Sequence, residues 1–301
     1  MRLYQVRART LKISAKSPPL RGVLQFEPAP AALAAYAPGF VFRDDPDAGG
    51  VVRWLPELRA SVQIMLADPV WSREAGSAAQ WAELPRVGLW GPRYDWAYGY
   101  ARARIRAYAF GLTALGLRAL TGSSAAILVN TVQPLHHLDP VLADRVTPRQ
   151  GENFACWCAR AAEHLISRFA MTDPGSNPVA AALPILATAD ANAVARAAEA
   201  CGMSQRHFRR ELLRFHGVSP KRWQRAVRVD RTLRQLHAAP WEEDAYAEPA
   251  AFSDQPHAIR EFRRFIGATP REYFRSKRTG DLTLRSLPVE GVDPPETQHD
   301  E

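Results

Sequence analysis

The sequence has no long apolar run. No stretch approaches the roughly 20 apolar residues that a helix needs to cross a bilayer. Met1–Arg9 carries charges where a secretory signal needs an apolar segment. These absences exclude an integral membrane protein, and we expect a cytoplasmic one.

Cysteine is also scarce. Three cysteines are too few and too poorly spaced for a disulfide scaffold or a four-ligand zinc site. Two sets of side chains offer weaker alternatives as metal ligands: Cys156 and Cys158 with His164, and His136 and His137 near Asp139. Residues two apart do not share a helix face, so buried structural residues are the favoured interpretation. We predict no catalytic residue, no metal site and no cofactor.

The composition indicates a folded protein with two domains. Of the 301 residues, 47% are hydrophobic and 23% are charged, as in ordinary globular proteins, and single cores stop growing near roughly 250–300 residues. Turn-forming residues from Thr172 to Pro178 indicate a linker between two separate cores. The predicted organisation is an N-terminal domain over residues 1–172, a linker over 173–184, a second domain over 185–278 and a disordered acidic tail over 279–301.

The N-terminal domain mixes strand and helix patterns, which predicts an α+β fold. Clusters of β-branched and aromatic residues predict strands over Val51–Leu55, Ser61–Leu66 and Ile105–Phe110. Helices are expected over Leu112–Leu120 and Asn153–Phe169. The aromatic residues between Trp54 and Tyr100 fit either an effector pocket or an ordinary aromatic core, and the core is favoured.

Net positive charge per residue is highest in the second domain. Of the 39 Lys+Arg and 31 Asp+Glu, residues 180–280 hold 18 and 11, a net +7, and residues 281–301 hold 1 and 6, a net −5. A basic segment suits a polyanionic partner through counterion release. A solvated basic surface is the alternative that charge alone leaves open.

The most informative feature is a repeat at an offset of 50 residues. Ser204–Pro220 aligns without gaps onto Asp254–Pro270, with eight of 17 positions identical. Each copy predicts one capped helix, because Ser204 and Asp254 are N-cap residues and Gly217 and Gly267 supply left-handed C-caps. One structural unit therefore occurs twice.

Two further helices complete a recognisable layout. Val194–Cys201, capped by Asp190 or Asn192, precedes the first copy, and a helix, a glycine turn and a capped basic helix make a helix-turn-helix. Lys221–His237 joins the copies as a helix of about 26 Å, at ~1.5 Å per residue. With its flanking turns it can hold the two recognition helices one DNA turn, ~34 Å, apart.

Residues 185–278 resemble the DNA-binding domain of the AraC/XylS family of transcription regulators. The resemblance rests on Ala198, Gly202–Ser204 and Phe208–Pro220 in the first unit and on Phe252–Phe262 and Gly267–Tyr273 in the second. It implies an all-α double helix-turn-helix domain that binds double-stranded DNA. It also implies a variable N-terminal domain that senses a small-molecule effector or forms a homodimer. Arg53–Pro56 and Leu89–Gly91 are similar to the N-terminal domains of one subset of the family.

The resemblance and the chemistry of base recognition predict the DNA-binding residues. Arginine matches guanine and glutamine matches adenine in the major groove. The predicted base contacts are Gln205, Arg206, Arg209 and Arg210 in the first unit and Gln255, His257 and Arg260 in the second. The predicted phosphate contacts are Lys221, Arg225 and Arg228, and Arg263 lies on the basic face of the second unit. For each arginine a solvated charge or a phosphate contact is the alternative, and for Arg210 and Arg260 a structural ion pair is another.

Two rival functions stay open beside a non-enzymatic, effector-controlled regulator. Pro249 interrupts the helix before the second copy, and Ala251 replaces a usual glycine, so the chain can be an interaction protein that has lost DNA binding. Some DNA-repair alkyltransferases carry such a domain beside a reactive cysteine. No Pro-Cys-His motif occurs, and Cys201 lies inside the first unit, which disfavours that enzyme.

Overall fold

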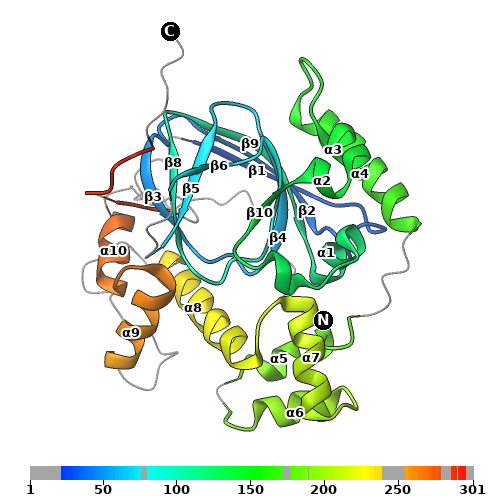
Figure 1. Cartoon of the computed structure of the whole chain (residues 1–301), viewed down its shortest axis with the longest axis vertical. Helices are drawn as coiled ribbons and strands as arrows, with labels where there is room; N and C mark the ends of the chain where they lie inside the picture. Colours follow the sequence, from blue (N-terminus) through cyan, green and yellow to red (C-terminus); the bar gives the residue numbers. More distant parts are fainter. Residues whose placement is uncertain are drawn as a thin grey trace.

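The computed structural model describes residues 22–75, 80–171, 177–188, 190–238, 255–278, 286–289 and 291–295. Two sheets and the helices that cover one of them form the N-terminal domain, and most of the C-terminal part is helical (Figure 1). One sheet contains, in spatial order, β1 (Val23–Pro28), β2 (Gly39–Asp45), β9 (Ile105–Leu112), β4 (Ala60–Met65), β7 (Val87–Trp90) and β10 (Val132–Pro134). The other contains β11 (Ser286–Pro288), β3 (Gly50–Trp54), β8 (Ala97–Ala101), β5 (Val70–Glu74) and β6 (Ala82–Glu83). Figure 1 shows the two curved sheets side by side, with the outline of a barrel.

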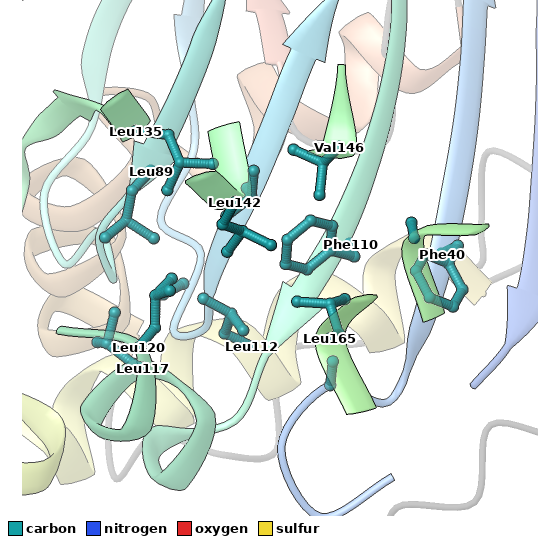
Figure 2. Packing of buried hydrophobic residues seen from close by; sticks show 14 of the residues in the cluster. Phe40, Leu89, Phe110, Leu112, Leu117, Leu120, Leu135, Leu142, Val146 and Leu165 are labelled. Atoms are coloured by element: carbon teal, nitrogen blue, oxygen red, sulfur yellow. The ribbon is translucent and has the colours of Figure 1, made fainter. Parts of the chain in front are cut away.

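Helices cover one face of the first sheet and enclose the first core. They are α1 (Ala114–Thr121), the 3-10 turn η1 (Ala125–Leu128), α2 (Leu135–Leu138), α3 (Pro140–Val146) and α4 (Phe154–Ala170). Alternate residues of β9, such as Phe110 and Leu112, point into this core beside Phe40 and Leu165 (Figure 2). Trp157 is fully buried and its indole N–H donates to the Val146 carbonyl at 2.7 Å. Burial of each such side chain stabilises the fold by roughly 1.5–3 kcal/mol.

The C-terminal helices build a second core. They are η2 (Ala180–Ala182), α5 (Leu183–Leu186), α6 (Ala193–Ala200), α7 (Gln205–His216), α8 (Pro220–Ala238), α9 (Gln255–Ile266) and α10 (Pro270–Arg278). Phe208 and Phe262, one from each copy of the repeat, are both fully buried there. Leu55 and Tyr94 of the N-terminal domain are buried in the same cluster. The second core is therefore not confined to the C-terminal helices, because Leu55, just after β3, and Tyr94, between β7 and β8, pack into it.

The predicted elements of the N-terminal domain are confirmed with shifts of one or two residues. β3, β4 and β9 occupy the predicted strand segments, and α1 and α4 the predicted helices. Asn153 caps α4, where its side-chain oxygen accepts from the Cys156 N–H at 2.9 Å. The α+β fold class followed by an all-α region is thus confirmed.

Two predicted boundaries need correction. Part of the predicted linker is helical, since η2 and α5 lie within 180–186, and Val179, Ala182 and Leu186 are buried in the second core. Residues 172–176 lie outside the described part. The tail is ordered where it is described: β11 pairs antiparallel with β3, with Leu287 opposite Arg53, and the Trp81 indole donates to the Asp293 carbonyl at 3.1 Å. The tail was expected to be disordered because it lacks periodicity, yet a strand of three residues needs only an open sheet edge.

Candidate DNA-binding interface

α7 has both of its ends fixed by the residues that the repeat predicted. The Ser204 hydroxyl accepts from the His207 N–H at 3.2 Å, and Gly217 adopts φ +75 with its N–H bonded to the Leu213 carbonyl at 2.9 Å. These bonds satisfy backbone groups that a helix end otherwise leaves without partners. α6 precedes α7, and Gly202 turns the chain between them with φ +64. The first helix-turn-helix is formed as predicted.

One face of α7 is buried and the other is basic. Phe208, Leu212 and Phe215 lie in the second core. The exposed residues on the opposite face are Gln205, Arg206, Arg209, Arg210, Leu213 and Arg214. Within this set the Arg209 guanidinium donates to the Gln205 side-chain oxygen at 3.4 Å. The predicted base-contacting residues of the first unit therefore lie together on a solvent-facing helix surface.

A buried carboxylate lies beneath that basic face. The Glu211 side chain is 11% exposed and lies 3.6 Å from His207, 3.8 Å from Arg210 and 3.9 Å from Arg214. These separations are longer than hydrogen bonds, and the Arg210 side chain stays 72% exposed. Surface ion pairs of this kind contribute little stability. Arg210 therefore remains accessible. The structural ion pair that was the alternative role for Arg210 is present only as a long contact with Glu211.

The equivalent glutamate of the second unit makes a close ion pair. Glu261, 50 positions after Glu211, accepts from Arg225 of α8, whose Nε lies 2.6 Å from one carboxylate oxygen while its terminal nitrogen bonds the other. The Glu261 side chain is 6% exposed and that of Arg225 is 29% exposed. This bidentate bond raises the pKa of Arg225 and fixes α9 to α8. The interpretation of Arg225 as a free phosphate contact is revised accordingly.

Other basic residues of α8 and α9 differ in their surroundings. Lys221 is exposed at the start of α8, Arg228 is half-buried and has interaction partners of its own, and Arg222 bonds Asp95 of the N-terminal domain at 2.5 Å. On α9, Arg260, Arg263 and Arg264 are exposed. The side chains of Gln255 and His257 lie outside the described residues, as do Asp254, Pro249 and Ala251.

α10 follows α9 as α8 follows α7, so the repeat extends into the next helix. Gly267 adopts φ +72 and bonds the Arg263 carbonyl at 2.9 Å. Thr269 and Glu272 then form a reciprocal capping box: the Thr269 N–H donates to the Glu272 carboxylate at 2.6 Å and the Glu272 N–H to the Thr269 hydroxyl at 3.1 Å. The backbone bond from Thr269 lowers the pKa of Glu272. Pro220 and Pro270 each begin the following helix.

A protein-family model matches the segment that contains α7, α8 and α9. A model described as a helix-turn-helix domain matches residues 197–276. This segment is an AraC-type helix-turn-helix domain. The AraC-type domain is a DNA-binding module of transcription regulators and covers α7, α8, α9 and nearly all of α10. No curated protein matches the sequence.

Solved structures with a similar arrangement include ToxT from Vibrio cholerae O395, with 11% sequence identity and a TM-score of 0.44. That match covers 78% of this chain and 97% of ToxT. Wild-type ToxT of Vibrio cholerae strain SCE256 with an unsaturated fatty acid bound has 9% identity and a TM-score of 0.45, over 78% of this chain and 94% of that one. Similarity at this level carries no argument about this chain.

The expectation of buried structural side chains holds for Cys158, whereas Cys156, His136 and His137 are exposed. Burial raises the pKa of the Cys158 thiol to about 12 and also raises that of Cys201, which disfavours the thiolate that an alkyl acceptor needs. In the described part of the chain, no three histidine, cysteine or acidic side chains gather as a metal site requires.

The tryptophans and tyrosines between Trp54 and Tyr100 pack on one another, as in the Trp54 and Trp90 pair, whose ring centres lie 5.1 Å apart. Among the described helices, none is long and apolar enough to span a bilayer.

Proposed function

We propose that the chain is a sequence-specific transcription regulator whose two recognition helices, α7 and α9, enter the DNA major groove. The observation that carries the proposal is the exposed basic face of α7 within an AraC-type domain. α8 has 19 residues, which gives a rod of about 28 Å at ~1.5 Å per residue. Figure 1 places α7 and α9 toward opposite ends of this rod. Such a length suits two contacts about one DNA turn apart.

The side chains divide into those that read bases and those that hold phosphates. Gln205, Arg206, Arg209 and Arg210 of α7 are proposed for base contacts, together with Gln255, His257 and Arg260 of α9. Lys221, Arg228 and Arg263 are proposed for phosphates. Arg225 is assigned instead to holding α9 in place through Glu261. Each phosphate contact adds about 0.9 to the slope of log affinity against log salt.

The test begins with selection of bound duplexes from a random library, followed by affinity measurement on the selected and on random DNA. Arg206→Ala is expected to weaken the selected duplex by about 1–3 kcal/mol, roughly 5- to 150-fold, while affinity for random DNA changes little. Arg102→Ala removes the same charge from an exposed turn of the N-terminal domain and is the matched control. Equal losses on both DNAs for Arg206→Ala would contradict base readout. If wild-type protein selects no sequence, the interaction protein without DNA binding becomes the better interpretation.

Control by a small molecule is the finer part of the proposal. The N-terminal domain contains an open cleft of about 530 Å³, within the size range of ligand sites. Its aromatic wall is Phe42, Tyr108 and Phe154, whose ring centres lie 5.4–5.8 Å apart, and its polar side includes Arg106 and Arg149. The nearby Glu152 carboxylate is neutralised by Arg160, at 2.8 Å from its Nε. The cleft therefore suits an anion with a flat, apolar body.

Thermal-shift measurements with a panel of aromatic and aliphatic carboxylates test this assignment. Ligands that stabilise wild-type protein are expected to lose most of that effect in Arg149→Ala, because the variant removes a cationic side chain from an exposed residue of the cleft lining. Arg102→Ala is again the control. A stabilising carboxylate that acts equally on wild type and Arg149→Ala would move the effector site elsewhere.

A further inference from the structure

One loop of the N-terminal domain contacts both helix-turn-helix units. This β7–β8 loop, residues 91–96, connects β7 to β8. Tyr94 is fully buried, and its hydroxyl donates to the carbonyl of His216, the last residue of α7, at 2.9 Å. Two residues later, Trp96 lies against Gly267 at the end of α9, where an added Cβ would come 2.6 Å from the indole. The same short loop thus touches the C-terminal ends of both recognition helices.

A network of polar bonds fixes the β7–β8 loop. The Asn130 side-chain oxygen accepts from the Tyr94 N–H at 2.8 Å, and its amide nitrogen donates to the Asp95 carboxylate at 2.8 Å. Asp95 in turn accepts from Arg222 near the start of α8, and the Arg222 guanidinium lies 5.8 Å from the centre of the Tyr94 ring. Charge-assisted bonds of this type are strong and directional. The loop is therefore bonded to Asn130, two residues past η1, on one side and to the helix that joins the two units on the other.

Asn130 holds an uncommon backbone conformation to make these bonds. Among the described non-glycine residues it alone has a positive φ, +60, in the left-handed region that asparagine tolerates better than most residues. Its own N–H donates to the Pro92 carbonyl at 3.0 Å, at the start of the loop. Residues held in such conformations cluster at functional sites. Asn130 is thus a clamp for the loop rather than an ordinary turn residue.

The N-terminal domain covers the same position in both copies of the repeat. Gly217 and Gly267 are equivalent, 50 residues apart, and each is a left-handed C-cap. At Gly217 an added Cβ would lie 2.3 Å from the Val129 side chain and 2.9 Å from the Ala125 carbonyl oxygen. At Gly267 it would meet Trp96. Both recognition helices are therefore held at one end by a single domain, while the basic face of α7 stays exposed.

We propose that the β7–β8 loop, clamped by Asn130, is a spacer that sets the separation of α7 and α9 and hence the half-site spacing that the protein accepts. The inference rests on the function proposed above. Trp96 lies against the end of α9, Asp95 bonds Arg222 of α8, and Asn130 holds the loop itself. All three are positioning residues, since they act through the loop and not through the exposed basic face. Each added base pair moves one half-site by about 3.4 Å and turns it by about 34°. With a rigid spacer the protein should therefore bind duplexes of altered half-site spacing weakly, and with a loosened spacer it should bind them more tightly.

The test uses the full chain and a duplex selected by wild-type protein, with up to four base pairs inserted between the half-sites or removed. Wild-type affinity is expected to fall at least about tenfold when the spacing changes by two base pairs. The double variant Asp95→Asn, Trp96→Ala should reduce that penalty to about threefold or less, with unchanged affinity for a single half-site. Glu83→Gln, in exposed β6, is the matched carboxyl-to-amide control.

Each result of the spacing test either supports or overturns the spacer. Single half-site affinity reports whether the helices themselves remain intact, so it separates loss of spacing from loss of folding. Asp95→Asn alone, which keeps the size of the side chain, should shift the profile in the same direction as the double variant. An unchanged profile in the double variant, or a loss of half-site binding in Asp95→Asn, overturns the spacer while leaving the proposed DNA-binding function intact. Failure of wild-type protein to bind any duplex selectively overturns both.

Discussion

Protonation of His216 should destabilise the fold in mildly acidic solution. The imidazole lies at the end of α7 beside Trp223, with ring centres 6.2 Å apart, and its buried Nε2 finds no hydrogen-bond partner among the described residues. Burial lowers the pKa of His216 from 6.5 to about 4. Because the folded state disfavours the proton, the unfolded chain binds more protons between pH 6.5 and 4, and stability falls as the pH falls through that window.

The size of the effect follows from the two pKa values. Between pH 7 and pH 4.5 the free energy of unfolding should fall by about 2 kcal/mol from this group alone. In His216→Gln the side chain cannot titrate. The free energy of unfolding, measured by thermal or urea unfolding, should therefore fall by about 2 kcal/mol less than in wild type between pH 7 and pH 4.5. His137→Gln changes an exposed histidine and is the control. Equal pH slopes in wild type and His216→Gln would refute the argument.

Three more predictions concern single contacts within and between the two domains. Gly217→Ala should cost about 2–5 kcal/mol of unfolding free energy, because strain at φ +75 adds to the clash with Val129. Gly202→Ala, at φ +64 in open space, should cost only the strain of about 1–2 kcal/mol, and equal melting temperatures would contradict this. Glu261→Gln should lower stability by about 1–3 kcal/mol in urea unfolding, since Arg225 loses its ion pair but stays partly solvated; no change would mean that the pair is dispensable. Removal of residues 286–301 should lower it by about 2 kcal/mol by freeing the edge of β3, and an unaltered melting curve would show that β11 adds nothing.

Local signals in the sequence predicted the DNA-binding helices well. Ser204 and Gly217 marked both ends of α7, and the spacing of Phe208 and Phe215 marked its buried face. These signals are local because a cap or a helical period involves residues a few positions apart. The same logic placed α8 within one residue at each end. The exposure of Arg206 and Arg209 then followed from the periodicity.

Contacts between distant residues could not be predicted in the same way. Glu211 and Glu261 are identical in the alignment, yet one is surrounded by arginines of its own helix and the other binds Arg225, 36 positions away. Tyr94 and Asn130 carry no motif, and their roles depend on how the sheet domain docks on the helices. The excess of aromatic residues was the one available signal for Tyr94. A sequence gives no sign of which aromatic side chain will lie between two domains.

The pairing of β11 with β3 also orders events during synthesis. Leu287 pairs with Arg53, which lies 234 positions earlier in the sequence and is synthesised first. The edge of β3 therefore stays unpaired while both helix-turn-helix units are synthesised. Unpaired strand edges can pair with strands of other chains. A chain cut short before Ser286 would keep that edge unpaired and would therefore be more prone to associate with other chains.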